Sequence, residues 1–484
     1  MTPPPHRARW PPYLVLGAFV VLLLSPTAIA AGALVAAALG TTILRRAHTR
    51  AARPEPTQDS AALLGTAEDG SAVHLTDHQL SAHTLILGAS GAGKSTTLLS
   101  ILTDQVRRGR GVVAIDMKGS PAFARELAVA AQRAGRPFRV WTLDGPGHWN
   151  PLANGNPTAL KDRLISAERW TEPHYQRAAE RYVQTVLQVW EQARPDHKPT
   201  LGGVVDLMDP RRLVTMLRDV PRPLATRVQD YLVSLGPDQL SAVRGLETRL
   251  AIIAESHTGA YLEPGGAGTI DLRASLRDRE VVLFSLNSSR YGKLAAQVGA
   301  LLIEDLTCAM GSRLEEGREL DGRGTAAPAD PAMIALDELS ALGAEHALNL
   351  VARGREAGLP VVVATQELAD LERAARGLRD QLVGITGVKI AHRQDVPSSA
   401  RTIAEIAGTE RVWEQTFQTD RRALLPGRDT GRGTRREVER YRVDPDTIKT
   451  LPTGHAVVIT KIPTSSVQKV RVHRPRAPSP LERG

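Results

Sequence analysis

The chain has 484 residues, a formal net charge of +9 and a single cysteine. This length exceeds what one hydrophobic core usually supports, and the lone Cys308 excludes an internal disulfide and a cysteine-rich metal site, as expected in a reducing compartment. The positive charge is concentrated at the ends, because residues 421–484 carry 15 Lys and Arg against 6 Asp and Glu, whereas residues 51–420 have a net charge of −5. The central part of the chain therefore lacks the basic surplus typical of a nucleic-acid-binding body.

An uncharged, largely apolar stretch covers residues 13–44 and is long enough for at least one membrane span. A single tilted helix needs only about 20 residues, whereas a helical hairpin would turn at the Ser-Pro-Thr sequence of residues 25–27. Arginines flank both ends, and the positive-inside rule places both flanks in the cytoplasm, which favours the hairpin. We therefore expect residues 1–46 to anchor the chain in the inner (cytoplasmic) membrane, residues 47–66 to form a linker, and the remainder to lie in the cytoplasm.

Residues 88–95 match the pattern G-x-x-x-x-G-K-[ST], in which the backbone N–H groups of a glycine-rich loop surround phosphate oxygens. A short apolar run at 84–87 precedes the loop, and apolar residues at helical spacing follow at 95–106, so the loop opens a helix whose dipole favours anions. We expect Lys94 to reach the β- and γ-phosphates of ATP and Ser95 to ligate Mg²⁺. The residues expected to contact the nucleotide are Gly88, Ala89, Ser90, Gly91, Ala92, Gly93, Lys94, Ser95 and Thr96.

Further strands are predicted at residues 111–115, 138–143, 281–285, 333–336, 360–364 and 383–391, with two more β-like runs at 455–461 and 467–473. Apolar residues between 158 and 257 follow helical spacing instead. Strands that alternate with helices predict an α/β fold with a mainly parallel sheet. We expect a nucleotide-binding domain made of residues 67–157 and 271–465, an all-α insertion at 158–270, loops at 311–331 and 426–436, and a basic Pro/Arg tail at 466–484.

An Asp-Glu pair follows the apolar run at 333–336. A strand that delivers Asp337 to the edge of the sheet supplies the carboxylate that the Mg²⁺ of a phosphate-loop enzyme needs, and Glu338 is placed to take a proton from an attacking water. The alternative is an ordinary acidic start of a helix. The next strand leads to Gln366, which is expected either to sense the γ-phosphate or to cap the strand end.

Arg353 and Arg355 lie at a predicted helix end, where cations complement the helix dipole or reach the nucleotide of a neighbouring subunit. His74, His78 and His83 precede the phosphate loop without a carboxylate or cysteine pattern, so surface or core positions are expected for them rather than a metal site.

The ordered set of motifs resembles the type IV secretion coupling proteins of the TraG/TraD kind, with their TraM-recognition segment. The matching motifs are LGASGAGKST (87–96), IDMKGS (115–120), WNPL (149–152), REVVLFSLNSSRYGKLAAQVGALLIEDL (279–306), LDELSALG (336–343), GREAGLPVVVATQEL (354–368) and DVPSSARTIAEIAGT (395–409). The resemblance implies a RecA-like ATPase that uses ATP and Mg²⁺ and assembles as a homohexamer. It assigns Lys94 and Ser95 to nucleotide and Mg²⁺, Asp337 and Glu338 to the second acidic motif, Gln366 to the glutamine motif, and Arg355 to a trans-acting arginine.

The resemblance also implies a membrane-anchored motor that moves DNA, in single-stranded form, together with relaxase or relaxosome proteins toward the components of a secretion channel. The short connection between the two expected spans departs from the family, because it leaves no room for an external domain. One alternative is a duplex-DNA translocase of the chromosome-segregation type, which ordinarily carries a winged-helix module that is not visible here. A second is a membrane docking protein for relaxase or effector proteins that uses nucleotide only as a switch.

Overall fold

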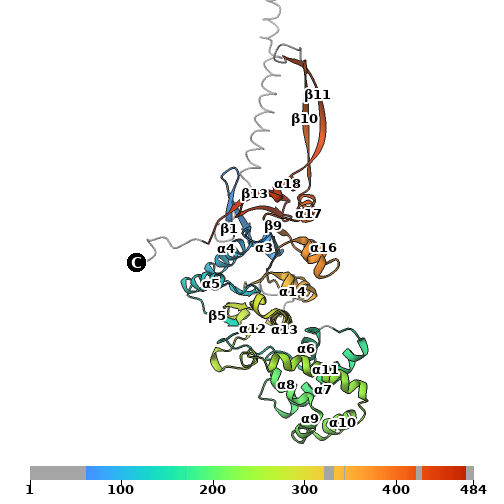
Figure 1. Cartoon of the computed structure of the whole chain (residues 1–484). Coiled ribbons are helices and arrows are strands. Elements are labelled where there is room, and N and C mark those ends of the chain that lie inside the picture. The colour runs from blue at the N-terminus through green and yellow to red at the C-terminus, as the bar shows by residue number, and fades with distance from the viewer. Residues whose placement is uncertain (1–60, 169, 321–331, 343, 421–427, 476–484) are drawn as a thin grey trace, which may run out of the picture. The chain divides into compact units, whose positions relative to one another are not determined.

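The computed structural model describes residues 61–475, except residues 169, 321–331, 343 and 421–427 (Figure 1). The predicted membrane anchor at residues 1–46 and most of the predicted linker lie outside the described residues.

An eleven-stranded sheet, with the order β2-β1-β13-β12-β9-β3-β8-β7-β4-β6-β5, forms the centre of the described chain. The seven strands from β9 to β5 run parallel, and β12, β13, β1 and β2 extend the sheet antiparallel beyond β9. The strands are β1 (Ala61–Ala67), β2 (Ala72–Thr76), β3 (Thr84–Leu87), β4 (Gly111–Asp116), β5 (Phe138–Thr142), β6 (Val281–Ser285), β7 (Ala332–Asp337), β8 (Val361–Thr365), β9 (Val388–Ala391), β12 (His455–Thr460) and β13 (Ser466–Val472). The predicted α/β fold with a mainly parallel sheet is confirmed.

Helices cover both faces of this sheet, which explains why its central strands are continuous apolar runs rather than alternating ones. Successive residues of β4 point to opposite faces, so that Val112 joins one hydrophobic core and Val113 the other. The first core contains helices α4 (Lys94–Arg107) and α5 (Pro121–Arg133). The second contains α12 (Leu272–Arg277), α13 (Ser288–Leu320), α14 (Ala344–Glu356), α15 (Leu368–Ala374), α16 (Leu378–Ile385), α17 (Pro397–Ala407) and α18 (Pro445–Lys449).

Between β5 and β6 the described residues from 157 to 268 form helices and no strand (green and yellow-green in Figure 1). These helices are α6 (Pro157–Ser166), α7 (Pro173–Ala193), α8 (Leu201–Met208), α9 (Pro210–Met216), α10 (Arg222–Val233) and α11 (Pro237–Ala254), followed by short 3₁₀ turns. Proline stands in the first turn of α6, α7, α9, α10 and α11, where its missing N–H costs nothing. This stretch is the one predicted as an all-α insertion.

A buried charge cluster joins the helical stretch to helix α13. Arg163 of α6 lies 3.0 Å from the Asp305 carboxylate of α13, and the indole Nε1 of Trp149 donates to the same carboxylate at 2.9 Å. Burial raises the pKa of Asp305 to about 6, whereas the charge of Arg163 and the indole hydrogen bond act in the opposite direction. All three side chains are buried, so removal of one partner would leave a costly unpaired group in the interior.

Helix α13 is the described helix that is long and apolar enough, over Ser288–Arg313, to cross a membrane. It is instead a core helix, because Val298, Leu301 and Leu306 are fully buried and α13 packs on α12, α14 and α6. The helix is interrupted at Gly292, whose φ of 34° and ψ of −95° are not helical.

Several segments differ from the sequence predictions. Strand β1 begins inside the predicted linker. Strand β13 confirms the β-like run expected at 467–473, but it belongs to the main sheet, where Val472 pairs with Gly65, and so is not part of a separate tail. The expected strand at 383–391 is shorter, because residues up to Ile385 belong to α16. Helix α13 extends to Leu320 and so occupies the first half of the predicted loop at 311–331, whose second half lies outside the described residues.

The predicted loop at 426–436 is also wrong in large part, because β10 (Thr409–Asp420) and β11 (Arg428–Tyr441) form an antiparallel hairpin that is separate from the main sheet. In the described part of this hairpin, Trp413 is 55% exposed, and the Arg435 guanidinium lies 4.5 Å from the centre of the Trp413 ring. This stacking and the Arg411–Glu439 ion pair at 3.9 Å are contacts between the two strands, and they stabilise the hairpin. The Gly- and Arg-rich sequence gives no indication of them.

Candidate nucleotide-binding and hydrolysis site

The phosphate loop connects β3 to α4, as predicted. Gly93 has a φ of +122°, which favours glycine, and a Cβ atom on Gly88 would lie 2.7 Å from Cβ of His392. The loop is held from outside, since Gly454 N donates to Ala92 O at 2.9 Å and Ala89 N donates to Arg393 O at 2.8 Å. These contacts fix a concave backbone at the start of a helix, where an anion is favoured.

Lys94 is buried, and its ammonium donates to the carbonyl oxygens of Gly88 and Ala89 within the loop. Burial lowers the pKa of Lys94, and the nearby charge of Lys118 lowers it further, whereas Glu338 and Asp337 raise it. The lysine is therefore packed against the loop that is expected to hold the phosphates.

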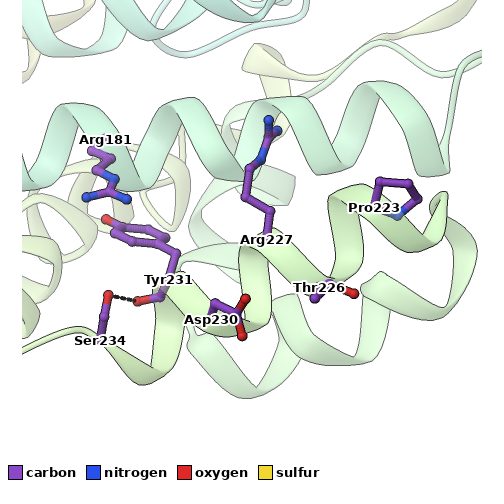
Figure 2. Close-up of a pocket in the computed structure, with 7 residues that line it drawn as sticks. All are labelled: Arg181, Pro223, Thr226, Arg227, Asp230, Tyr231 and Ser234. Atoms are coloured by element: carbon purple, nitrogen blue, oxygen red, sulfur yellow. Dashed lines mark hydrogen bonds between the residues drawn. The ribbon is translucent and has the colours of Figure 1, made fainter.

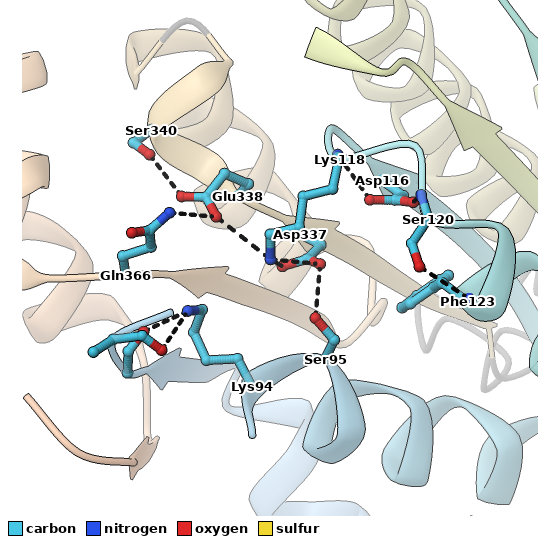
Figure 3. Close-up of polar contacts among 12 residues, drawn as sticks. Lys94, Ser95, Asp116, Lys118, Ser120, Phe123, Asp337, Glu338, Ser340 and Gln366 are labelled. Carbon is cyan, nitrogen blue, oxygen red and sulfur yellow. Dashed lines mark hydrogen bonds and ion pairs between the residues drawn. The ribbon is translucent and has the colours of Figure 1, made fainter. Parts of the chain in front are cut away.

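The hydroxyl of Ser95 donates to Asp337 Oδ2 at 3.3 Å across 242 residues of chain (Figure 3). Asp337 is the last residue of β7, and the parallel strands deliver it to the same sheet edge as the phosphate loop. A hydroxyl and a carboxylate that converge in this way are the hard oxygen ligands that Mg²⁺ prefers when it shares its coordination with phosphates. No cluster of three His, Cys, Asp or Glu side chains suited to a metal occurs among the described residues.

Glu338 directly follows and adopts a left-handed conformation, with φ of 65° and ψ of 60°. Such a conformation costs a non-glycine residue roughly 1–3 kcal/mol and is often found at functional sites. Ser340 Oγ donates to Glu338 Oε1 at 3.0 Å, and Gln366 Nε2 donates to Oε2 at 3.2 Å (Figure 3). The fold thus brings Lys94, Ser95, Asp337, Glu338 and Gln366 together at one edge of the sheet.

Two buried or half-buried residues at this edge were missed in the sequence analysis. Lys118 lies 3.2 Å from both carboxylate oxygens of Asp337 and 3.4 Å from Glu338 Oε2. Burial by itself would lower the pKa of Lys118, but the two carboxylates raise it above its usual value. The motif IDMKGS contained the signal, since a lysine follows a buried strand there, but only strand pairing shows what it faces.

His392 is the second missed residue. Its Nδ1 lies 2.8 Å from the carbonyl oxygen of His455, and its Nε2 lies 2.8 Å from Thr97 Oγ1 in α4. Burial lowers the pKa of His392 to about 4, so the ring is neutral near pH 7. Because a carbonyl only accepts, Nδ1 carries the proton and Nε2 accepts from Thr97. No local pattern around residue 392 predicts this contact.

Arg353 and Arg355 are exposed at the end of α14, as predicted, and neither side chain forms a hydrogen bond or ion pair within the described part of the chain. Arg355 lies close to the buried His83, whose pKa is lowered to about 4 by burial and by the charge of Arg355. His83 precedes β3, so Arg355 is at the amino edge of the sheet, whereas Asp337 and Gln366 are at the carboxyl edge. Arg355 is therefore not part of the site of its own chain.

A groove of about 1100 Å³ adjoins the phosphate loop. Gly93 and Thr96 line it from the loop and the start of α4, and residues 66–68, 447, 450–455 and 469–474 line the other sides. The volume suits the sugar and base of a nucleotide whose phosphates lie in the loop. A second, shallower depression of about 660 Å³ lies between α7 and α10, where Arg181 stacks 4.2 Å from the centre of the Tyr231 ring (Figure 2). None of the predicted site residues lines this depression.

Residues 331–453 match a family model described as the TraM recognition site of TraD and TraG. Among solved structures, the unbound bacterial conjugative coupling protein TrwBΔN70 is similar, with a TM-score of 0.63 and 15% sequence identity over 89% of this chain and 92% of that one. The resemblance to TraG/TraD-type coupling proteins is confirmed. No curated protein matches the sequence.

Two further structures share the fold. TrwB in complex with ADP and Mg²⁺ has a TM-score of 0.60 and 13% identity, over 89% of this chain and 92% of that one. VirB4 of Thermoanaerobacter pseudethanolicus has a TM-score of 0.53 and 14% identity, over 89% of this chain and 99% of that one. At such identities the likeness establishes the fold, a phosphate-loop α/β domain of the TrwB kind that includes the helical stretch between β5 and β6.

Proposed function

We propose that this chain is a membrane-anchored coupling ATPase that hydrolyses ATP and drives DNA, alone or bound to protein, toward a conjugative or type IV secretion channel. The observation that carries the proposal is the convergence of Ser95, Asp337, Glu338 and Gln366 beside the phosphate loop. These side chains come from β3–α4, β7 and β8, in a domain whose residues 331–453 match the TraM recognition site of TraD and TraG.

ATP and Mg²⁺ fit the donor groups present. The loop amides and the Lys94 ammonium hold the phosphates, and Ser95 with Asp337 supplies oxygen ligands for Mg²⁺. When bound, Mg²⁺ neutralises charge on the phosphate oxygens. Lys94 would release the carbonyls of Gly88 and Ala89 and turn its ammonium toward the β- and γ-phosphates.

Glu338 is the proposed general base. One of its oxygens accepts from Ser340 and the other from Gln366, so the carboxylate has a fixed orientation with lone pairs left for a water molecule. Gln366 connects this base to the end of β8, next to the phosphate loop, because Gly88 N donates to the Gln366 carbonyl at 3.0 Å. Loss of the γ-phosphate would therefore alter the contacts of Gln366 in two ways, through its side chain on Glu338 and through its backbone on the phosphate loop.

Arg355 is proposed to act in trans. Its guanidinium has no hydrogen-bond or ion-pair partner in the described part of the chain, and its position at the amino edge of the sheet leaves it available to the nucleotide of the next subunit in a ring. We propose a homohexamer, in which each interface would combine one phosphate loop with one arginine.

The proposed partners are DNA, in single-stranded form, relaxase or relaxosome proteins, and components of a secretion channel. The apolar residues 13–44 support an anchor in the inner membrane with the ATPase in the cytoplasm. A second function is favoured by the description of the matched family as a recognition site, which suits a docking protein that uses nucleotide only as a switch.

Turnover separates the two functions. The full chain, purified in detergent, is assayed for ATP hydrolysis without DNA, with single-stranded DNA and with duplex DNA. A motor is expected to hydrolyse ATP continuously and faster with DNA, with single-stranded DNA the stronger activator. A switch would bind ATP and hydrolyse it slowly regardless of DNA, and stronger activation by duplex DNA would favour a translocase of the chromosome-segregation type.

A further inference from the structure

Lys118 forms ion pairs with both acidic residues of the site. Its ammonium is 3.2 Å from both oxygens of Asp337 and 3.4 Å from Glu338 Oε2 (Figure 3). It contacts the same Asp337 Oδ2 atom that accepts from Ser95. The ammonium therefore lies against the carboxylate that is expected to ligate Mg²⁺.

The fold holds Lys118 in this place. Its backbone N–H donates to the buried Asp116 carboxylate at 2.9 Å, and Ser120 N donates to the other oxygen at 2.7 Å. Asp116 is paired with Asp337 in the β4–β7 register, so Lys118 leaves the sheet two residues beyond the partner of Asp337. The next residue, Gly119, has a φ of +68°, and a Cβ atom there would lie 2.7 Å from Cβ of Asn287. A rigid turn thus presents the lysine to the acidic pair.

Lys118 offsets the electrostatic repulsion between Asp337 and Glu338. Asp337 and Glu338 are both buried, and two adjacent buried carboxylates repel one another unless a cation lies close to them. Lys118 is about one third exposed and supplies that cation from within the chain. A divalent cation at Asp337 would have to compete with the ammonium for the same oxygen atoms.

We propose that Lys118 is a positioning residue that acts as a built-in counter-ion for Asp337 and Glu338 and sets how strongly nucleotide binding depends on Mg²⁺. The inference rests on the proposed ATPase function and deepens it. With Lys118 present, the site tolerates ATP without metal, because the acidic pair is partly neutralised. Without Lys118, the site becomes more negative by one charge, which disfavours metal-free ATP more than the Mg²⁺ complex and removes a competitor of Mg²⁺ at Asp337.

The test measures the dissociation constant of a fluorescent ATP analogue on the full chain in detergent, once with EDTA and once with saturating Mg²⁺. The measured quantity is the ratio of the dissociation constant in EDTA to the dissociation constant in Mg²⁺. Lys118→Met is expected to raise this ratio about tenfold or more relative to the unsubstituted chain, whereas Lys118→Arg keeps the charge and stays near the unsubstituted value. Lys198→Met is the matched control, because Lys198 is exposed in the α7–α8 loop, away from the site, and should leave the ratio unchanged.

Glu338→Gln provides an independent second variant. Removal of one negative charge beside an intact Lys118 should lower the ratio, and the double variant Lys118→Met/Glu338→Gln should return it toward the unsubstituted value. An unchanged ratio in Lys118→Met, or an equal loss of affinity with and without Mg²⁺, would overturn the role proposed for Lys118 and leave the ATPase proposal intact. Absence of nucleotide binding by the unsubstituted chain would overturn the proposed function itself, and this inference with it.

Discussion

The side-chain amide of Gln366 donates to the carboxylate of Glu338 at 3.2 Å, across the neighbouring strands β7 and β8. The same glutamine accepts a hydrogen bond from Gly88 of the phosphate loop through its backbone carbonyl. One residue thus links the expected base to the loop that holds the phosphates, which makes Gln366 a means of aligning Glu338 with bound nucleotide.

Substitutions at this pair should separate chemistry from alignment. Glu338→Gln is expected to keep ATP binding and to slow hydrolysis by roughly 10²- to 10⁴-fold, because the amide keeps the shape and loses the base. Gln366→Ala should slow hydrolysis less, by roughly tenfold, since the base remains but loses one of its two orienting donors. Steady-state turnover and nucleotide affinity measured together check both effects. Unaltered turnover in Glu338→Gln would locate the base elsewhere.

Two buried histidines should make stability depend on pH. The pKa of His83 and of His392 is lowered to about 4 in the folded chain, mainly by burial, whereas an unfolded histidine titrates near 6.5. Their stabilising contribution is complete above about pH 6.5 and is lost as the pH falls toward 4, because only the unfolded state binds the protons in that interval. Protonation of each histidine in the unfolded state lowers the free energy of unfolding by up to about 3 kcal/mol.

Thermal unfolding of the full chain in detergent between pH 7.5 and 4.5 checks this dependence. His392→Asn keeps a donor for the His455 carbonyl and should show a flatter fall of the unfolding temperature with pH than the unsubstituted chain. His74→Asn is the matched control, because His74 is exposed on β2 and should leave the slope unchanged. Equal slopes in all three proteins would contradict the prediction.

Local sequence predicts those parts of the site that consist of one strand and the residues directly after it. The phosphate loop and the Asp337–Glu338 pair follow from an apolar run and the polar residues at its end, and the structure brings them together as expected. Lys118 and His392 could not be assigned in this way. Their partners lie 219 and 295 residues away and become neighbours only through the pairing of β4 with β7 and the packing of α4 against the loop after β9.

The errors in the fold have local causes. The run at 383–391 is apolar throughout, and such a short run does not distinguish the end of α16 from the start of β9. Glycine and arginine around residue 432 are typical of a loop, yet β11 pairs with β10 there, so tertiary pairing overrides low strand propensity. Strand β1 contains small residues, and it is a strand because β2 and β13 flank it on both edges.

Removal of residues 1–50 tests the anchor. The truncated chain loses the uncharged stretch at 13–44 and should move from the membrane fraction to the soluble fraction, with nucleotide binding kept, since the described sheet begins at Ala61. Weaker self-association is expected as well. Fractionation by centrifugation with and without high salt distinguishes an apolar anchor from charge attraction of the basic tail to lipid. A truncated chain that still sediments with membranes at high salt would contradict the predicted anchor.

Arg355 gives the sharpest test of assembly. It is exposed at the end of α14 beside His83, at the sheet edge opposite Asp337, so it cannot serve the nucleotide of its own chain. If it stabilises the transition state on the next subunit, Arg355→Ala should bind ATP normally and hydrolyse it roughly 10³- to 10⁵-fold more slowly. Arg353→Ala is the matched control, because Arg353 is also an exposed arginine, two residues away at the same helix end, and should retain turnover.

Mixing the variants decides between an action within one chain and an action across an interface. Lys94→Ala subunits lack a working phosphate loop but keep Arg355, whereas Arg355→Ala subunits have the reverse defect. A mixed ring contains some interfaces that join an intact loop to an intact arginine, so activity should reappear on mixing and reach its maximum near equal proportions. Each variant should remain inactive alone, and mixing Lys94→Ala with Glu338→Gln should restore nothing, because both defects lie on the same side of the interface. Failure of Arg355→Ala to complement in rings shown to contain both subunits would leave this arginine as a cation that only complements the dipole of α14.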